Sequence, residues 1–217
     1  MQASITIGRT VVNGVGKALR ESGQALDRLG LTISGETIFQ STLSRHRAVM
    51  PVGIDYLPQV SNDKTFIAPT ASVIGDVNIA SGGSIWYGTV LRADVEGASI
   101  SIGTSSNVQD RSVIIGKVSI GNNVTVGHGA LMDGNIDIHD NCLIGQGSII
   151  GTDCVVETNS ILAAGAVLLP RTTIPKGQMW AGNPAKYVRD CKPEELKTFE
   201  VQAKHYVELA AEHHNSF

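Results

Sequence analysis

Aromatic residues are scarce in this sequence, making up only 5% of 217 residues. Because aromatic side chains supply much of the buried area of many cores, a core here must be built mainly from aliphatic residues. Three cysteines are too few for a disulfide framework and favour a reducing compartment. The net charge of −3 gives no indication of nucleic-acid binding. No apolar run approaches the roughly 20 residues that span a bilayer.

Glycine, in contrast, is abundant at 24 residues, and an apolar residue recurs at every sixth position. The main run comprises Ile102, Val108, Ile114, Ile120, Val126, Met132, Ile138, Ile144, Ile150, Val156, Leu162, Leu168, Ile174 and Trp180. An earlier run with the same period comprises Ile67, Val73, Ile79, Ile85 and Leu91. The two runs differ in phase by one residue, which places an irregularity between Arg92 and Ser101, near Glu96.

A period of six fits neither an α-helix nor a long plain strand. It fits a short strand followed by a turn, three of which close a coil of about 18 residues. The sequence therefore predicts an all-β core, a parallel β-helix of hexapeptide repeats with about six coils between Ile67 and Trp180. Small residues follow the apolar positions by four and are expected at crowded corners: Ser106, Ser112, Ala130, Cys142, Ser148, Cys154, Ser160 and Ala166. Cys142 and Cys154 are accordingly interpreted as corner residues and not as a redox pair.

The segments on either side of the repeat have helical patterns. We expect a targeting and helical segment over residues 1–50, the β-helix over residues 51–190, and a C-terminal helix packed on it over residues 191–217. The first twenty residues contain Arg9, Lys17 and Arg20 but no acidic residue. This composition is typical of a mitochondrial presequence and equally of a retained basic helix that contacts a partner or a membrane surface. The C-terminal helix carries one apolar stripe: Leu196, Phe199, Ala203, Tyr206 and Ala210.

Several segments match the motifs of one family. They are Ser84–Gly88 (SIWYG), Val90–Asp94 (VLRAD), Asn107–Asp110 (NVQD), Thr125–His128 (TVGH), Trp180–Lys186 (WAGNPAK), Gly16–Gly30 and Leu43–Arg47. These segments resemble the γ-class carbonic anhydrases, in particular their plant and algal mitochondrial branch. The resemblance implies a left-handed β-helix and assembly as a trimer. For that branch it also implies a place on the matrix side of the mitochondrial inner membrane, in the membrane arm of complex I (NADH:ubiquinone oxidoreductase).

Members of this family hold zinc with three histidines, which fall at positions 115, 128 and 133 of this sequence. Positions 115 and 133 lie 18 residues apart, one coil, so they stack on one face, whereas position 128 lies on another face and would reach a neighbouring subunit. The residues present are Ile115, His128 and Asp133. Catalytic zinc normally keeps three protein ligands, so the chain alone is expected neither to bind zinc nor to be an enzyme. Ile114–Ile120 also lacks the insertion in which active relatives carry proton-transfer groups.

Two interpretations of His128 stay open. It is either a surface histidine hydrogen-bonded to Asp110, or a single ligand donated to zinc at an interface with a histidine-complete paralogue. By the same resemblance, Arg92 and Asp94 match residues that form ion pairs between subunits. Gln109 and Asp110 match residues that line the site.

The expected function is that of a non-catalytic subunit in a heterotrimer of paralogues bound to complex I. One alternative is a zinc-dependent carbonic anhydrase that hydrates CO2 at a mixed interface through His128. A weaker alternative is a hexapeptide acyltransferase, for which the sequence shows no extended loop for coenzyme A.

Overall fold

The computed structural model describes residues 15–16, 18–19, 21–26, 29–30, 33, 46, 48–52, 56–61 and 63–214. The chain divides into two compact units, Met1–His46 and Arg47–Phe217. In the first unit, the described residues from 15 to 33 are helical. Within the described part of the chain, no helix has the length and apolar character needed to cross a membrane.

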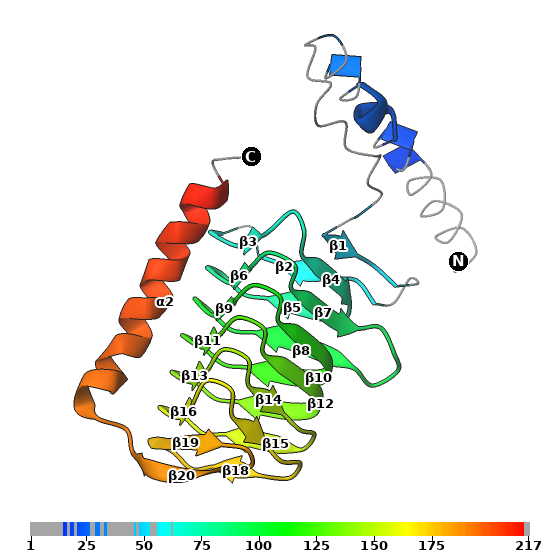
Figure 1. The fold of residues 1–217 in the computed structure, drawn as a ribbon. Coiled ribbons are helices and arrows are strands. Elements are labelled where there is room, and N and C mark those ends of the chain that lie inside the picture. The colour runs from blue at the N-terminus through cyan, green and yellow to red at the C-terminus, as the bar shows by residue number, and fades with distance from the viewer. Residues whose placement is uncertain are drawn as a thin grey trace, which may run out of the picture. The chain divides into compact units, whose positions relative to one another are not determined.

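The second unit is a stack of parallel strands with three flat faces (Figure 1). The first face contains β1 (Val49–Met50), β4 (Ser72–Gly75), β7 (Val90–Ala93), the first halves of β10 (Val113–Ile120) and β12 (Leu131–Ile138), β14 (Ile149–Ile150) and β17 (Val167–Leu168). The second face contains β2 (Gln59–Val60), β5 (Val77–Ile79), β8 (Ser99–Ile102), the second halves of β10 and β12, β15 (Cys154–Val156) and β18 (Thr173–Ile174). The third face contains β3 (Phe66–Ile67), β6 (Ser84–Ile85), β9 (Asn107–Val108), β11 (Thr125–Val126), β13 (Leu143–Ile144), β16 (Ile161–Leu162) and β19 (Gln178–Gly182), with β20 (Ala185–Asp190) antiparallel at its end.

Each face thus receives one strand per coil, and the stack has about seven coils. The predicted parallel β-helix of hexapeptide repeats is confirmed. Its additional coil is the one that β1 and β2 begin, ahead of Ile67 where the sequence period was first visible. Strands of adjacent coils pair 18 residues apart, as Val113 does with Leu131.

From Ile67 onward, one coil is longer than the others; the opening coil also has wider offsets, since Val49 pairs with Val73 and Gln59 with Asn78. Val90 pairs with Val113, 23 residues further on, and Val77 pairs with Ile100 at the same offset. Five additional residues therefore lie between β7 and β8, at residues 94–98, within the segment where the sequence placed its irregularity. In a period of six, an insertion of five residues gives the observed phase change of one.

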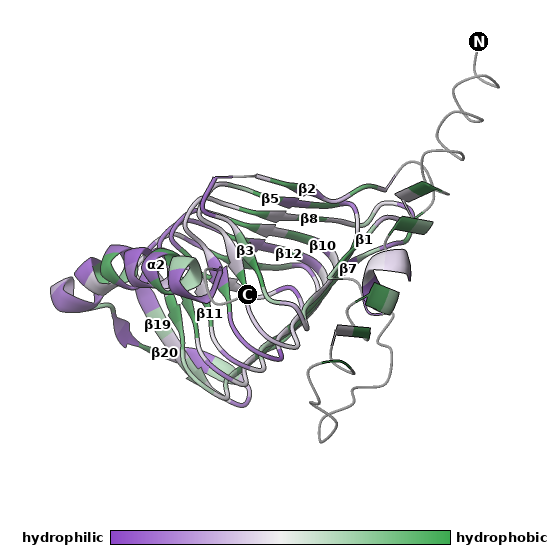
Figure 2. Ribbon diagram, turned by 90° about the horizontal axis from the view of Figure 1, so that it is seen from above, coloured by the Kyte–Doolittle hydropathy of each residue, from purple (hydrophilic) through white to green (hydrophobic). Residues whose placement is uncertain are grey.

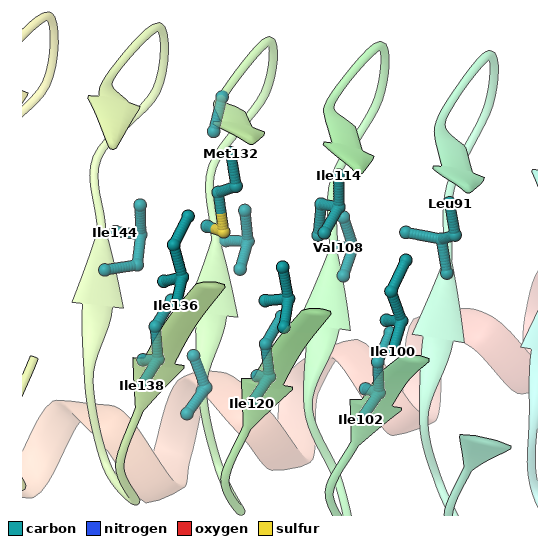
Figure 3. Packing of buried hydrophobic residues seen from close by; sticks show 14 of the residues in the cluster. Leu91, Ile100, Ile102, Val108, Ile114, Ile120, Met132, Ile136, Ile138 and Ile144 are labelled. Atoms are coloured by element: carbon teal, nitrogen blue, oxygen red, sulfur yellow. The ribbon is translucent and has the colours of Figure 1, made fainter. Parts of the chain in front are cut away.

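The apolar residue of each hexapeptide points into the stack, and equivalent residues of successive coils form columns. Figure 3 shows one such column in Ile102, Ile120 and Ile138. Each of these three side chains is at most 3% exposed. Stacked aliphatic side chains at this spacing fill the interior with few voids, which explains why so few aromatic residues are needed.

The small corner residues predicted from the sequence are all buried. Several of them donate a hydrogen bond to a carbonyl oxygen about one coil ahead: the Ser112 hydroxyl to Gly127 at 2.9 Å, and the Cys154 thiol to Leu169 at 3.1 Å. Burial raises the pKa of the Cys142 thiol to about 12. The two cysteines therefore take the structural place of corner serines, as the sequence predicted.

Helix α2 (Pro193–His214) lies beside the third face and runs back toward the first coils, where it contacts β3 and β6 (Figures 1 and 2). Phe199, Ala203 and Ala210 of the predicted stripe are buried. Leu196 is 36% exposed, so the prediction was wrong for this residue. The first turns of α2 stand off the third face and leave a groove of about 350 Å³, lined from the helix by Glu195 and Gln202.

Candidate functional site

Ile115 and Asp133 lie next to each other on the first face, paired in register between β10 and β12. Arg92 of β7 pairs with Ile115 from the other side. Because Ile114 and Met132 are fully buried, their neighbours Ile115 and Asp133 point outward. These residues form one outward column, in which a half-buried isoleucine separates a cation from a carboxylate.

His128 lies at another corner, in the turn that follows β11 of the third face. Its Nδ1 atom is 3.3 Å from Oδ2 of Asp110, which occupies the equivalent turn one coil earlier. The other oxygen of Asp110, Oδ1, accepts a hydrogen bond from the backbone N–H of Tyr87 at 3.0 Å. A carboxylate at Nδ1 favours the tautomer with the proton on that nitrogen, which leaves the lone pair on Nε2.

The structure therefore brings His128 and Asp110 together and places Ile115 and Asp133 on a different sheet. Among the described residues of the chain, no group of three histidine, cysteine, aspartate or glutamate side chains could hold a metal ion. Ile115 has no donor atom, and Asp133 supplies only carboxylate oxygens. The described residues of one chain thus do not fit a catalytic zinc, which needs three protein ligands.

Gln109 and Asp110 are adjacent in sequence but serve different surroundings. Gln109 is 5% exposed, and its Nε2 donates to Asn107 at 3.3 Å. It lines the groove beneath α2. Asp110 instead lines an open hollow of about 500 Å³ together with His128 and three residues not anticipated from the sequence: Tyr87, Arg111 and Gly129.

Arg92 and Asp94 pair with one another within the chain. Arg92 Nε donates to both carboxylate oxygens of Asp94 at 2.9 Å. The pair lies at the start of the inserted residues 94–98 and continues the outward column of Ile115 and Asp133. This leaves the guanidinium Nη atoms available for further contacts.

Arg111 has an unusual backbone conformation. Its φ of 58° lies in the left-handed region, where the equivalent turn residues of the neighbouring coils are Gly88 and Gly129. A side chain in this region costs about 1–2 kcal/mol relative to the usual conformation. The sequence signal was present, since arginine interrupts a column of glycines at this corner.

His213 was also not anticipated as part of the site. Its Nδ1 lies 2.8 Å from the hydroxyl of Tyr87, in contact with the rings of Trp86 and Phe66. It continues the apolar stripe of α2 by one more step of three residues from Ala210, which is the signal that could have identified it.

Beside the outward column of Ile115, the first face carries a continuous row of aliphatic residues. The row is formed by Val90, Val113, Leu131, Ile149 and Val167, each paired in register with the next. Leu131 and Ile149 are 38% and 43% exposed. A contiguous apolar row on the outside of a sheet is typical of a protein–protein interface.

Together, the stacked coils and inward aliphatic columns define a hexapeptide-repeat protein. The family model described as bacterial transferase hexapeptide (six repeats) matches residues 135–170. Among solved structures, a hexapeptide transferase family protein from Anaplasma phagocytophilum is 38% identical, with a TM-score of 0.71 over 76% of this chain and 96% of that chain. A putative acetyltransferase from Bacillus cereus is 28% identical, with a TM-score of 0.72 over 78% and 98% of the two chains.

Gamma carbonic anhydrase 1, mitochondrial, from Arabidopsis thaliana is 44% identical to this chain, covering 96% of this chain and 77% of its own length. Gamma carbonic anhydrase 2, mitochondrial, from the same organism is also 44% identical, covering 96% and 76%. This chain therefore belongs to the γ carbonic anhydrase family.

Proposed function

We propose that this chain is a non-catalytic subunit of a mitochondrial trimer of γ-carbonic-anhydrase paralogues, with a role in assembly. The observation that carries the proposal is the column of Arg92, Ile115 and Asp133. By the family resemblance, positions 115 and 133 of this column are two of the three zinc-ligand positions, and the residues here supply one carboxylate and no imidazole. No step of CO2 hydration is assigned to it.

The aliphatic row on the first face supports assembly. Leu131 and Ile149 are exposed in the isolated chain, and burying such side chains contributes about 25 cal/mol per Å². Ile115 extends the same apolar surface in place of a polar ligand. Loss of a metal ligand together with retention of an apolar contact surface is what a subunit kept for assembly needs.

Mitochondrial location is supported by the names of the relatives, which are mitochondrial proteins, and by the basic residues Arg9, Lys17 and Arg20. Attachment to the matrix side of the inner membrane, in the membrane arm of complex I, follows from the resemblance to the plant and algal branch. Isolating complex I from the source cells and identifying its subunits by mass spectrometry tests this attachment. Absence of the chain from complex I, with its presence elsewhere in mitochondria, would contradict it.

A second function is favoured by the Asp110–His128 contact. A carboxylate that fixes the tautomer of an imidazole is the usual arrangement behind a metal-ligating histidine. In a mixed trimer, His128 would supply the third ligand to a paralogue that has histidines at the positions of Ile115 and Asp133. The zinc there would act as the Lewis acid for CO2 hydration, and this chain would contribute the orientation of one ligand.

The deciding measurement is zinc content and CO2 hydration for this chain alone and co-assembled with a histidine-complete paralogue. A chain that forms trimers without zinc supports the assembly role. Zinc in the mixed trimer that is lost on His128→Ala supports ligand donation. His139→Ala is the matched control, because the His139 side chain is 42% exposed, against 52% for His128, and also lies 3.3 Å from an aspartate, Asp137. Stoichiometric zinc in the chain alone would overturn the assignment.

A further inference from the structure

The C-terminal turn of α2 lies against the turn that carries Tyr87, and Tyr87 in turn contacts Asp110. We infer that His213 and Tyr87 are positioning residues for His128, acting through Asp110. The inference rests on the proposal that His128 faces a neighbouring subunit. It adds that α2, at the far end of the sequence, determines how the imidazole is presented.

The ring of His213 packs against Trp86 and Phe66, which together form an aromatic socket. The ring centroid of His213 lies 5.1 Å from that of Trp86 and 6.0 Å from that of Phe66, two side chains that are at most 5% exposed. Its Nδ1 shares a hydrogen bond of 2.8 Å with the hydroxyl of Tyr87. The end of α2 is therefore fixed to the turn after β6 by both ring packing and a directional contact.

Tyr87 connects this socket to the candidate site. Its side chain faces His213, and its backbone N–H donates to Oδ1 of Asp110 at 3.0 Å. With Oδ1 held in this way, Oδ2 is the atom that faces His128 Nδ1 at 3.3 Å. Four groups thus form one line of contacts, from His213 through Tyr87 and Asp110 to His128.

A second residue of α2 indicates the same proximity. Tyr206 packs edge-to-face on Trp86, with ring centroids 5.5 Å apart. Burial raises its pKa, and the nearby carboxylate of Asp110 raises it further. Tyr206 of the helix is therefore close enough to Asp110 to be affected by its charge.

The simpler possibility is that the aromatic socket only docks α2 on the coils. The two roles differ in what happens to His128 when the socket is weakened without loss of the fold. Under the positioning role, removing the His213–Tyr87 contact loosens the Tyr87 turn, Asp110 leaves its orientation, and the Nδ1 proton of His128 loses its acceptor. Under the docking role, His128 is unaffected.

The test is nitrogen NMR of the His128 imidazole in the full-length chain, at a pH high enough to keep the ring neutral. We expect the Nδ1–H tautomer to predominate. His213→Ala and Tyr87→Phe should each lower the ratio of Nδ1–H to Nε2–H about twofold to tenfold, as loss of one hydrogen bond in a network implies. His213→Gln, which keeps a hydrogen-bonding group, should largely restore it. His214→Ala, at the exposed neighbouring position, is the control.

Asp110→Asn provides the direct reference, and circular dichroism verifies that each variant is folded. A tautomer ratio that changes with Asp110→Asn but not with His213→Ala or Tyr87→Phe would leave α2 with a docking role and overturn the inference. A wild-type ring without Nδ1–H preference would overturn it as well. The spectra need no metal and no partner, so they test the positioning role independently of zinc binding. If zinc in mixed trimers proves independent of His128, that result contradicts ligand donation but leaves the positioning test valid.

Discussion

Two corners of the same β-helix differ sharply in what they retain. At the corner beside Ile115 and Asp133, the side chains are an isoleucine between an arginine and a carboxylate, next to an exposed aliphatic row. At the corner of His128, a histidine, an aspartate and a backbone N–H remain in hydrogen-bonding arrangement. Under the proposed function, the first corner corresponds to the half of an interfacial site that would supply two ligands, and the second to the half that would supply one.

Under the proposed function, the difference corresponds to a one-sided loss of metal ligands. A chain released from all metal-related constraints would be expected to lose order at both corners. In the proposed arrangement, the half that would supply two ligands has isoleucine and aspartate at those positions, while the half that would supply one is held by contacts from two coils and from α2. This contrast favours the proposal that the chain donates one ligand to a neighbouring subunit and does not itself supply two.

The largest change in zinc content is expected when histidines are introduced at the corner that lacks them. Ile115→His combined with Asp133→His places two imidazoles one coil apart on the first face, where they can share a metal with His128 of a neighbouring copy. Zinc should rise from essentially none to about one per chain, measured by elemental analysis of the purified trimer. The double variant Ile115→His with Asp137→His is the control, because residue 137 pairs with residue 119 and lies out of register. Equal zinc in both variants would contradict the assignment of the column.

A large loss of stability is expected directly beneath the altered column. Ile114 is 0% exposed and stacks in the interior between Leu91 and Met132. Ile114→Ala should lower the free energy of unfolding by about 3 kcal/mol, because it removes buried methyl groups and leaves a cavity. Urea denaturation measures this, with Lys117→Ala on the exposed side of the same strand as control. If the two variants lost equal stability, the inward direction of the hexapeptide position would be wrong.

These two predictions concern features that can be predicted from the repeat alone. A period of six residues determines which side chains point into the stack. The burial of Ile114, the outward position of Ile115 and its register with Asp133 therefore all followed from residue spacing. The same spacing separated His128 from them. Contacts that depend on where a helix ends cannot be predicted from this period. His213 contacts Tyr87 because of how far α2 extends along the third face. The hexapeptide spacing contains no information about that distance.

The number of inserted residues could also not be predicted from the six-residue period. A phase change of one residue is compatible with a deletion of one or an insertion of five, and only strand pairing distinguishes them. Likewise, Gln109 and Asp110 were expected in the same site. The buried link of Gln109 to Asn107 could not be foreseen, because it depends on which side chain of the pair turns toward α2.

A smaller effect is expected from the backbone of the retained corner. Gly129 has a φ of 66°, and a Cβ added there would meet no atom within 4 Å. Gly129→Ala should therefore cost about 1 kcal/mol from backbone strain alone. Arg111→Gly, at the equivalent position one coil earlier with a φ of 58°, should stabilise the chain by up to about 1 kcal/mol. Urea denaturation of both variants provides the test, and destabilisation by Arg111→Gly would show that the arginine side chain itself supports this corner.

The smallest effect is expected where α2 is attached far from the retained corner. Arg189 donates two hydrogen bonds of 2.7 Å to Glu195, and these, together with the Lys192 backbone N–H, lower the pKa of Glu195 from 4.5 to about 2. A carboxyl group with a lowered pKa in the folded state stabilises the fold above its ordinary pKa, and this contribution is lost as the pH falls from about 4.5 to 2. Because the pair is partly solvated, Glu195→Gln should cost no more than about 1 kcal/mol near neutral pH.

The difference in unfolding free energy between wild type and Glu195→Gln should shrink toward zero as the pH approaches 2, with Glu194→Gln in the same helical turn as control. The NMR tautomer ratio of His128 should stay constant in Glu195→Gln, because this ion pair holds the start of α2 and the aromatic socket holds its end. A shift of that ratio would mean that the whole helix, and not its last turn, positions the imidazole. The contrast between the two corners would then depend on α2 as a single rigid element.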